Sequence, residues 1–341
     1  MKDIIATKEA PPAAQIGISA RRKMTASCYD ANHLPRATGA GEVTEGPNGA
    51  PVQTMQCGVR VIAGGYGGEW TTGLIRDLNG VHEPQEEALF AALLDALPDA
   101  RTMVELGCNW SYYSLWFLSR DPASRRAVGL EPDADALALG RRNAALNDLT
   151  MTFEHGSIGV PAKRLRAAPQ TSLQALMDKH GVDRADILHF DIQGAEAEVI
   201  GSLGPLVRAG RIGAIFAATH DHTITGDPLT HQKCLGLVEA LGGELLFEFE
   251  PHEGFAGDGL IVANFSREPL NWSPPHITRN RYSTSLTRNP LYDLASAQER
   301  NRALRRKLKR WENAGPAALA RLWWRSWRKR RQPRIRPPSG S

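Results

Sequence analysis

Three shortages in this 341-residue sequence exclude classes of protein before any motif is considered. Cysteine is scarce: Cys28, Cys57, Cys108 and Cys234 form no Cys-x-x-Cys pair and have no histidine spaced for zinc. This pattern argues against a disulfide-stapled secreted domain and predicts reduced thiols in a cytoplasmic protein. No apolar run approaches the roughly 18 residues of a membrane-spanning helix. Charges and prolines near the N-terminus stand where a signal peptide would need an apolar core.

Charge is distributed unevenly along the chain. Residues 299–336 contain 15 basic and two acidic residues, although the whole chain has a net charge of only +4. The part of the chain before this segment is therefore acidic. An acidic body with a basic tail predicts a separate partner for the tail.

Composition divides the chain into four predicted segments. Residues 1–58 are rich in Ala, Pro, Gly and Thr without sustained periodicity, which is typical of a largely disordered or loosely packed extension. Residues 59–267 have the regular apolar pattern of a main domain. The proline-rich residues 268–290 predict a linker, and residues 291–341 predict a basic amphipathic helical tail.

Segments of strand and helix character alternate within the main domain. Strands separated by helices at this rhythm predict an α/β fold with a mostly parallel sheet covered on both faces. The expected strands are 102–106, 127–131, 150–154, 187–191 and 211–218, and the expected helices are 84–97, 112–118, 134–146, 172–180, 195–203 and 232–241.

The alternation ends in two consecutive strands, at 244–250 and 260–265. So short a connection cannot link parallel strands, so the two must form an antiparallel hairpin. A parallel sheet that ends in an antiparallel hairpin is typical of the Rossmann-like class I methyltransferase fold.

The segment MVELGCNWSYYS, residues 103–114, predicts a strand, a turn with one glycine (Gly107) and a helix. Open α/β sheets bind ligands at the carboxyl ends of their strands, where the strand order reverses. The next strand ends in Glu131, whose carboxylate can accept hydrogen bonds from two vicinal ribose hydroxyls. A single glycine argues against a pyrophosphate, which needs close backbone contact, and favours S-adenosylmethionine, which has no phosphate. The alternative is a glycine turn in an unrelated α/β protein.

Three segments resemble the signature segments of the FkbM family of methyltransferases: MVELGCNWSYYS, GLEPDADALALGRRNAALN and DILHFDIQGAEAEVI. The flanking segments GVHEPQEEALF, FAATHDHT and DGLIVANF extend the resemblance over about residues 60–265. The resemblance implies an enzyme that uses S-adenosylmethionine to methylate a hydroxyl of a sugar, a glycan or a secondary metabolite. The sequence departs from the family pattern at Asn109-Trp110, where many members have a glycine-rich loop. A non-catalytic scaffold that does not bind the cofactor is therefore an alternative.

The resemblance also implies a set of cofactor-binding residues. Glu105 and Gly107 would flank the methionine moiety, with Asn109 beside them in the turn. Glu131 would hold the ribose, and its alternative role is that of an acid at the N-terminus of the next helix. Ser157 would lie near the adenine, and Asp191 is a further expected cofactor residue. Gln85 and Glu86 belong to the upstream segment, which would cover the cofactor; the alternative is that this segment simply starts a helix.

The expected catalytic groups follow the fourth and fifth parallel strands. Asp191 could orient the acceptor, take its proton or bind the ammonium group of the cofactor. A neutral His220, with a pKa of about 6.5, is suited to take a hydroxyl proton. In an extended chain His222 shares the face of His220, whereas Asp221 points away. Asp191, His220 and Asp221 or His222 could alternatively form a magnesium site, but two or three ligands from separate strand ends are too few to establish one, so no metal is predicted.

The basic tail contains two apolar faces. The first has the spacing of a short coiled-coil seam, and the second lies opposite arginines, as in a helix on an anionic membrane surface. We expect the tail to contact an anionic membrane or the acidic body, with nucleic acid as the least favoured partner. The two faces are Leu294, Ala297, Asn301, Leu304, Leu308 and Trp311, and then Leu319, Leu322, Trp323 and Trp327.

Together these patterns predict a cytoplasmic O-methyltransferase that uses S-adenosylmethionine and acts on a sugar or glycan hydroxyl. Its tail would allow peripheral binding at the inner face of the membrane. A methyltransferase of a small secondary metabolite and an RNA-binding methyltransferase that uses the tail are the alternatives.

Overall fold

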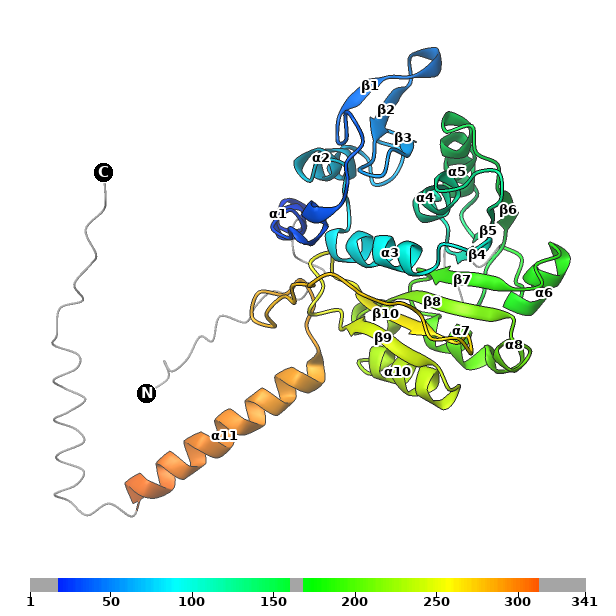
Figure 1. The fold of residues 1–341 in the computed structure, drawn as a ribbon. Helices are drawn as coiled ribbons and strands as arrows, with labels where there is room; N and C mark the ends of the chain where they lie inside the picture. Colours follow the sequence, from blue (N-terminus) through cyan, green and yellow to red (C-terminus); the bar gives the residue numbers. More distant parts are fainter. Residues whose placement is uncertain (1–17, 160–167, 313–341) are drawn as a thin grey trace, which may run out of the picture. The chain divides into compact units, whose positions relative to one another are not determined.

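A seven-stranded sheet forms the centre of the main body in the computed structural model, which describes residues 18–159 and 168–312 (Figure 1). The first five strands in spatial order are parallel, and the sixth runs antiparallel to both of its neighbours. In that order the strands are β6 (Thr152–His155), β5 (Arg126–Glu131), β4 (Thr102–Leu106), β7 (Ala185–Phe190), β8 (Ile212–Thr219), β10 (Gly259–Asn264) and β9 (Glu244–Phe249).

This strand order is that of the class I methyltransferase fold. The predicted α/β class, the parallel sheet and the final antiparallel pair of strands are confirmed. The strand order reverses at β4, which lies between β5 and β7. The carboxyl ends of β4 and β7 therefore flank the crevice in which open α/β sheets bind ligands.

Helices cover both faces of the sheet and enclose two hydrophobic cores (Figure 1). Met103 and Phe216 belong to one core, and Val104 and Ile215 belong to the other. Successive strand residues thus alternate between the faces, as the pleat requires. The helices are α3 (Pro84–Ala96), α4 (Tyr112–Ser119) and α5 (Ala134–Leu146) on the first face, and α6 (Leu173–Lys179), α7 (Glu196–Ser202), α8 (Gly204–Arg208) and α10 (Thr230–Ala240) on the second.

The N-terminal segment is structured from residue 18 onward, so the expectation of a loose extension over residues 1–58 is wrong for this part. Residues 1–17 lie outside the described residues. Met55 is buried, and Arg22 donates from its Nε to Asp77 over 2.7 Å. Strands of three or four residues are too short to show a clear period in the sequence. The elements are α1 (Ile18–Thr25), η2 (Asp30–His33), β1 (Val43–Glu45), η3 (Pro47–Gly49), β2 (Pro51–Thr54), β3 (Arg60–Ile62) and α2 (Glu69–Asp77), of which β1, β2 and β3 form a small antiparallel sheet.

Residues 268–289 cross the body as an irregular strap that packs on it, where the sequence predicted a linker. Ile277 and Leu286 are buried. Thr278 donates to Asp30 from its backbone N and from its hydroxyl, each over 2.8 Å. Buried side chains and hydrogen bonds to the body distinguish this strap from a flexible linker.

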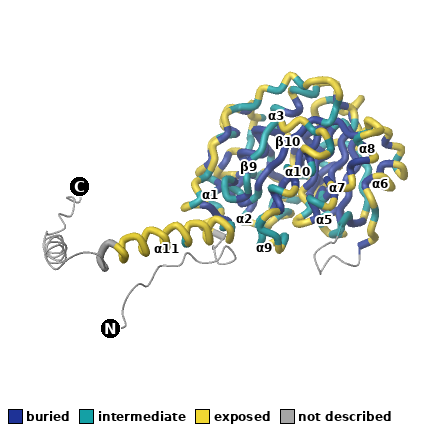
Figure 2. Tube along the Cα trace, turned by 90° about the horizontal axis from the view of Figure 1, so that it is seen from below, coloured by how far each residue is buried: buried dark blue, intermediate teal, exposed yellow. Residues whose placement is uncertain are grey.

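The C-terminal helix α11 (Pro290–Glu312) forms a unit of its own. Its 23 residues include exposed leucines of the three-four pattern, and Figure 2 shows most of the helix as exposed. The second predicted apolar face, at residues 319–327, lies outside the described residues. None of the helices in the described part of the chain is long and apolar enough to cross a membrane.

Candidate functional site

A cleft opens at the carboxyl ends of β4, β5 and β7. Its empty volume, with open solvent included, is about 870 Å³. The sheet brings together five of the residues that the sequence suggested for cofactor binding. These are Gly107, Asn109, Glu131, Ser157 and Asp191.

Gly107 makes the turn at the end of β4. Its φ of +75° lies in the left-handed region, and a Cβ at this position would overlap the carbonyl oxygen of Asp191. Only glycine therefore fits here. Asn109 and Ser111 follow with φ angles of 42° and 63°. Such strained positions persist only where the surrounding structure fixes them, and they cluster at ligand sites.

Glu131 holds this loop from the end of β5. Its carboxylate accepts hydrogen bonds from the backbone N of Asn109 at 2.9 Å and of Asp133 at 2.8 Å. Burial raises the pKa of Glu131. A carboxylate has about four lone-pair positions, so capacity remains for the hydroxyls of a nucleoside. The alternative role in helix capping belongs to Asp133, which accepts from the backbone N of Asp135 and Ala136 at the start of α5.

Ser157 lines the cleft just beyond β6. It is buried, and its hydroxyl has no hydrogen-bond partner among the described residues. Its backbone is fixed, because its N donates to the carbonyl oxygen of Pro169 at 2.8 Å and its own carbonyl accepts from Thr171 at 2.9 Å. Buried polar groups in proteins are nearly always hydrogen-bonded. A polar ligand in the cleft would satisfy this one.

Glu105 does not line the cleft. Its buried carboxylate accepts hydrogen bonds from the backbone N of Ser114, at 3.2 Å, and from the hydroxyl of the same residue, and it lies 3.7 Å from Nδ1 of His189. Burial raises the pKa of Glu105 to about 8. The structure thus places Glu105 as a link between β4 and the start of α4, and its expected place beside the methionine moiety stays a prediction.

Gln85 and Glu86 also lie outside the lining of the cleft. Gln85 donates to the carbonyl oxygens of Glu253 and Thr278 and accepts from the backbone N of Phe255, so its amide holds the strap and the β9–β10 loop. The expected role of Gln85 in cofactor binding stays a prediction beside this tethering role. Glu86 is buried, and burial, together with the negative charge of nearby acids, raises its pKa well above the usual value.

His220, which follows β8, is buried between three carboxylates. Its Nδ1 lies 2.5 Å from Oε1 of Glu196, and its Nε2 lies 3.0 Å from Oδ1 of Asp191 and 3.6 Å from Oδ1 of Asp258. Burial lowers the pKa of His220, but the surrounding carboxylates outweigh burial and hold this pKa well above its usual value. The ring is therefore an imidazolium and cannot take a proton. This corrects the prediction that neutral His220 is the base.

Two carboxyl groups beside His220 have different pKa values. Desolvation alone would raise the pKa of Asp191, but the hydrogen bond and charge of His220 lower it. Asp191 is therefore ionised, and 45% of its side chain remains exposed. Burial raises the pKa of Asp258, in the loop between β9 and β10, to about 7; His220 opposes this rise and Asp191 adds to it. Asp258 can therefore exchange a proton near neutral pH.

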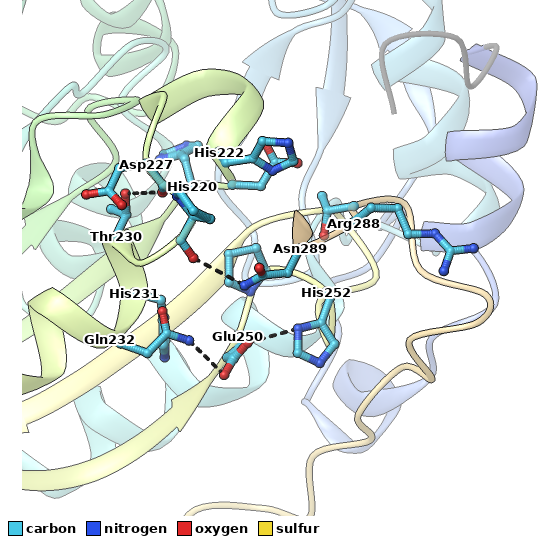
Figure 3. Close-up of a pocket in the computed structure, with 14 residues that line it drawn as sticks. His220, His222, Asp227, Thr230, His231, Gln232, Glu250, His252, Arg288 and Asn289 are labelled. Carbon is cyan, nitrogen blue, oxygen red and sulfur yellow. Dashed lines mark hydrogen bonds and ion pairs between the residues drawn. The ribbon is translucent and has the colours of Figure 1, made fainter. Parts of the chain in front are cut away.

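His222 joins neither the cleft nor this carboxylate network. It begins α9 (His222–Thr225) and lines a second cavity, with an empty volume of about 330 Å³ (Figure 3). In that cavity Gln232 donates to Glu250 at 2.9 Å, and Glu250 pairs with His252 at 3.0 Å. Within residues 18–159 and 168–312, no group of three or more His, Cys, Asp or Glu is arranged to hold a metal ion.

Sequence reasoning missed three residues of the site. Asp258 is the first residue of the segment DGLIVANF, and Glu196 is the last residue of FDIQGAE. Both segments carry the resemblance to the FkbM family, so their place in these segments could have indicated that the two residues belong to the site. Tyr66 lines the cleft and stacks on Trp110 with ring centroids 4.8 Å apart. No sequence pattern indicated Tyr66.

No family model and no curated protein matches this chain. Several solved structures are similar to it at low identity. An O-methyltransferase from Bacillus cereus in complex with SAH is 18% identical, with a TM-score of 0.38 over 52% of this chain and 80% of that one. A precorrin-6y C5,15-methyltransferase from Geobacter metallireducens is 14% identical, with a TM-score of 0.37 over 52% and 87%. A ribosomal protein L11 methylase from Lactobacillus delbrueckii subsp. bulgaricus is 13% identical, with a TM-score of 0.36 over 58% and 81%.

At these TM-scores the similarity is weak, and the strand order itself defines the class I methyltransferase fold. Membership of the FkbM family stays a prediction.

Proposed function

We propose that this protein is an S-adenosylmethionine-dependent O-methyltransferase that acts on a hydroxyl of a sugar or glycan. The observation that carries the proposal is the cleft at the reversal of strand order, where Gly107, Glu131 and Ser157 converge beside Asp191. Function depends on the residues of a site and not on the fold alone, and these residues support the proposal.

The residues present fit the cofactor. The carboxylate of Glu131 has spare lone pairs for two ribose hydroxyls, and the buried hydroxyl of Ser157 lacks a partner among the described residues. Gly107 leaves room where any side chain would collide with the backbone of Asp191. When bound, S-adenosylmethionine would supply the electrophilic methyl group.

The carboxylate network supplies what an alcohol acceptor needs. Asp191 is ionised and partly exposed in the cleft, so it can accept a hydrogen bond from the acceptor hydroxyl and orient it. Asp258, with a pKa of about 7, is matched to take the hydroxyl proton near neutral pH as the oxygen gains the methyl group. His220 is the positioning residue, because its imidazolium lies within 3.6 Å of both carboxylates. Carboxyl groups such as those of Asp191 and Asp258 suit an acceptor with several hydroxyl donors.

Calorimetry with S-adenosylmethionine and with its demethylated product tests the cofactor assignment. Glu131→Gln should weaken both affinities by about 10- to 100-fold, because a charged acceptor is lost. Glu239→Gln, at an exposed position of α10, is the matched control and should bind like the wild type. If the folded wild-type protein binds neither ligand, the scaffold alternative replaces the enzyme.

Transfer of a labelled methyl group tests the acceptor class. We expect label in free sugars or soluble glycans, as a methyl ether identified by nuclear magnetic resonance. Label in RNA alone, or only in small phenolic alcohols, would overturn the sugar assignment and leave the methyltransferase assignment in place.

A further inference from the structure

The helix α11 has an apolar stripe whose leucines are exposed. Leu294, Leu304 and Leu308 are 54%, 61% and 60% exposed, although three-four spacing places them on one side of the helix. Asn301 lies in the same stripe. A stripe of this kind is buried against a partner in most proteins, and its exposure here calls for one.

The charged residues around the stripe are nearly all basic. Residues 299–310 contain seven basic residues and one acidic residue. Arg300 and Lys307 flank the stripe on one side, and Arg305 flanks it on the other, given about 100° of rotation per residue. All three are exposed. Their long side chains can lie along an apolar surface and extend their charges beyond it.

This charge pattern argues against a second copy of α11 as the partner. In a parallel pair of these helices, the positions beside the seam would place Arg300 of one copy opposite Arg305 of the other. Like charges in those positions are repulsive. The helix also offers only about three heptads, with Asn301 in the middle of the seam.

We propose that α11 is an amphipathic helix that binds the surface of a bilayer containing anionic lipids. The leucines would enter the boundary between headgroups and acyl chains, while Arg300, Arg305 and Lys307 contact lipid phosphates. A helix of 23 residues is about 35 Å long, and it would lie in the plane of the interface. Nucleic acid fits less well, because phosphate contacts and base stacking give exposed leucines no role.

Flotation of the full-length protein with two kinds of vesicle tests the proposal. Vesicles of phosphatidylglycerol mixed with phosphatidylcholine should bind the protein at low salt and release much of it at high salt. Vesicles of phosphatidylcholine alone should bind it far more weakly. Equal binding to both kinds, or binding to neither, would overturn the proposal.

Substitutions within the full chain separate the leucine stripe from the charges. Leu304→Ser with Leu308→Ser should weaken vesicle binding by about tenfold or more, because apolar burial is lost. Arg305→Gln with Lys307→Gln should weaken it by about fivefold for each charge removed. Ala303→Ser, on the opposite half of the helix, is the control and should bind like the wild type.

Two other outcomes would assign a different partner. If the leucine substitutions convert a dimer into a monomer and leave vesicle binding unchanged, the stripe joins two copies of the chain. If RNA binds more tightly than the anionic vesicles and the leucine substitutions do not weaken it, the helix is a nucleic-acid contact. Either result would overturn the membrane assignment, and neither bears on cofactor binding in the cleft.

Discussion

Two polar regions adjoin at the carboxyl edge of the sheet, and they differ in how much hydrogen-bonding capacity they leave unused. In the cleft, Ser157 has a buried hydroxyl without a partner among the described residues, and Glu131 keeps spare lone pairs. In the adjoining network both ring nitrogens of His220 are engaged, as are those of His231 in the second cavity. Among the buried oxygens of the three carboxylates around His220, only Oε2 of Glu196 lacks a partner in the described part of the chain. Unused capacity that faces the cleft marks where a ligand would bind, whereas engaged groups hold other side chains in place.

Among the substitutions that compare the cleft with the network around His220, Asp258→Asn should have the largest effect. We expect turnover to fall by about 10²- to 10⁴-fold, because an amide cannot take the hydroxyl proton. Wild-type turnover should decline as the pH drops below about 7, where Asp258 becomes protonated. The pH profile of kcat checks both statements. Asp221→Asn, at the cap of α9, should leave the profile intact, and a decline that persists in Asp258→Asn would assign the titration to another group.

His220→Gln should act on stability and on turnover together. It leaves buried carboxylates without their cation, so the free energy of unfolding should fall by about 3–5 kcal/mol. The pKa of His220 is raised by folding, so its stabilising contribution is complete below about pH 6.5 and is lost as the pH rises through the folded pKa. Urea unfolding at several pH values should therefore show the largest difference from wild type at about pH 6.

The matched control for that substitution is His231→Gln, which removes another buried histidine with two partners. It should lose stability and keep normal turnover. His220→Gln should also raise the pKa values of Asp258 and Asp191, because the charge of His220 lowers both, and the rise at Asp258 should move the acidic limb of the pH profile upward. If both variants keep normal turnover and the profile does not move, His220 has only a structural role.

The sequence could predict the parts of the fold and the site that depend on local features, but not those that depend on contacts between distant segments. Strand ends are local features, so the strand at 102–106 and the helix at 134–146 match the structure at both ends, and the positions of Gly107 and Glu131 followed from them. Asp258 lies in a turn after β9, and nothing local shows that the order of β8 and β10 brings it to His220.

The surrounding carboxylates, acting against burial, reverse the protonation expected for His220. An isolated histidine is neutral at physiological pH, and spacing along the chain could not show that Glu196 lies 2.5 Å from its Nδ1. The N-terminal sheet was missed because strands such as Val43–Glu45 contain only three residues and gain their stability from tertiary contacts.

Gly107→Ala tests whether the turn at β4 is required for both folding and binding. The added Cβ would meet the backbone of Asp191 at a φ of +75°, so we expect a loss of roughly 3 kcal/mol in the free energy of unfolding and loss of cofactor binding. Gly210→Ala is the control, because φ is +70° there and no atom lies within 4 Å of the added Cβ. Equal losses in the two variants would mean that backbone strain alone, and not the close approach to Asp191, restricts position 107.

Ser157→Ala has the smallest expected effect and separates the two regions most directly. Since no described residue bonds this buried hydroxyl, its removal should leave the free energy of unfolding unchanged or slightly higher. Affinity for the demethylated cofactor should nevertheless fall about fivefold, the loss of one hydrogen bond of about 1 kcal/mol. Ser114→Ala is the opposite case, because that hydroxyl donates to the buried Glu105 outside the cleft, and it should lose stability while keeping cofactor affinity. Thermal unfolding and calorimetry on both variants give the comparison. If Ser157→Ala loses stability and retains full affinity, its hydroxyl belongs to the packed interior and not to the ligand site.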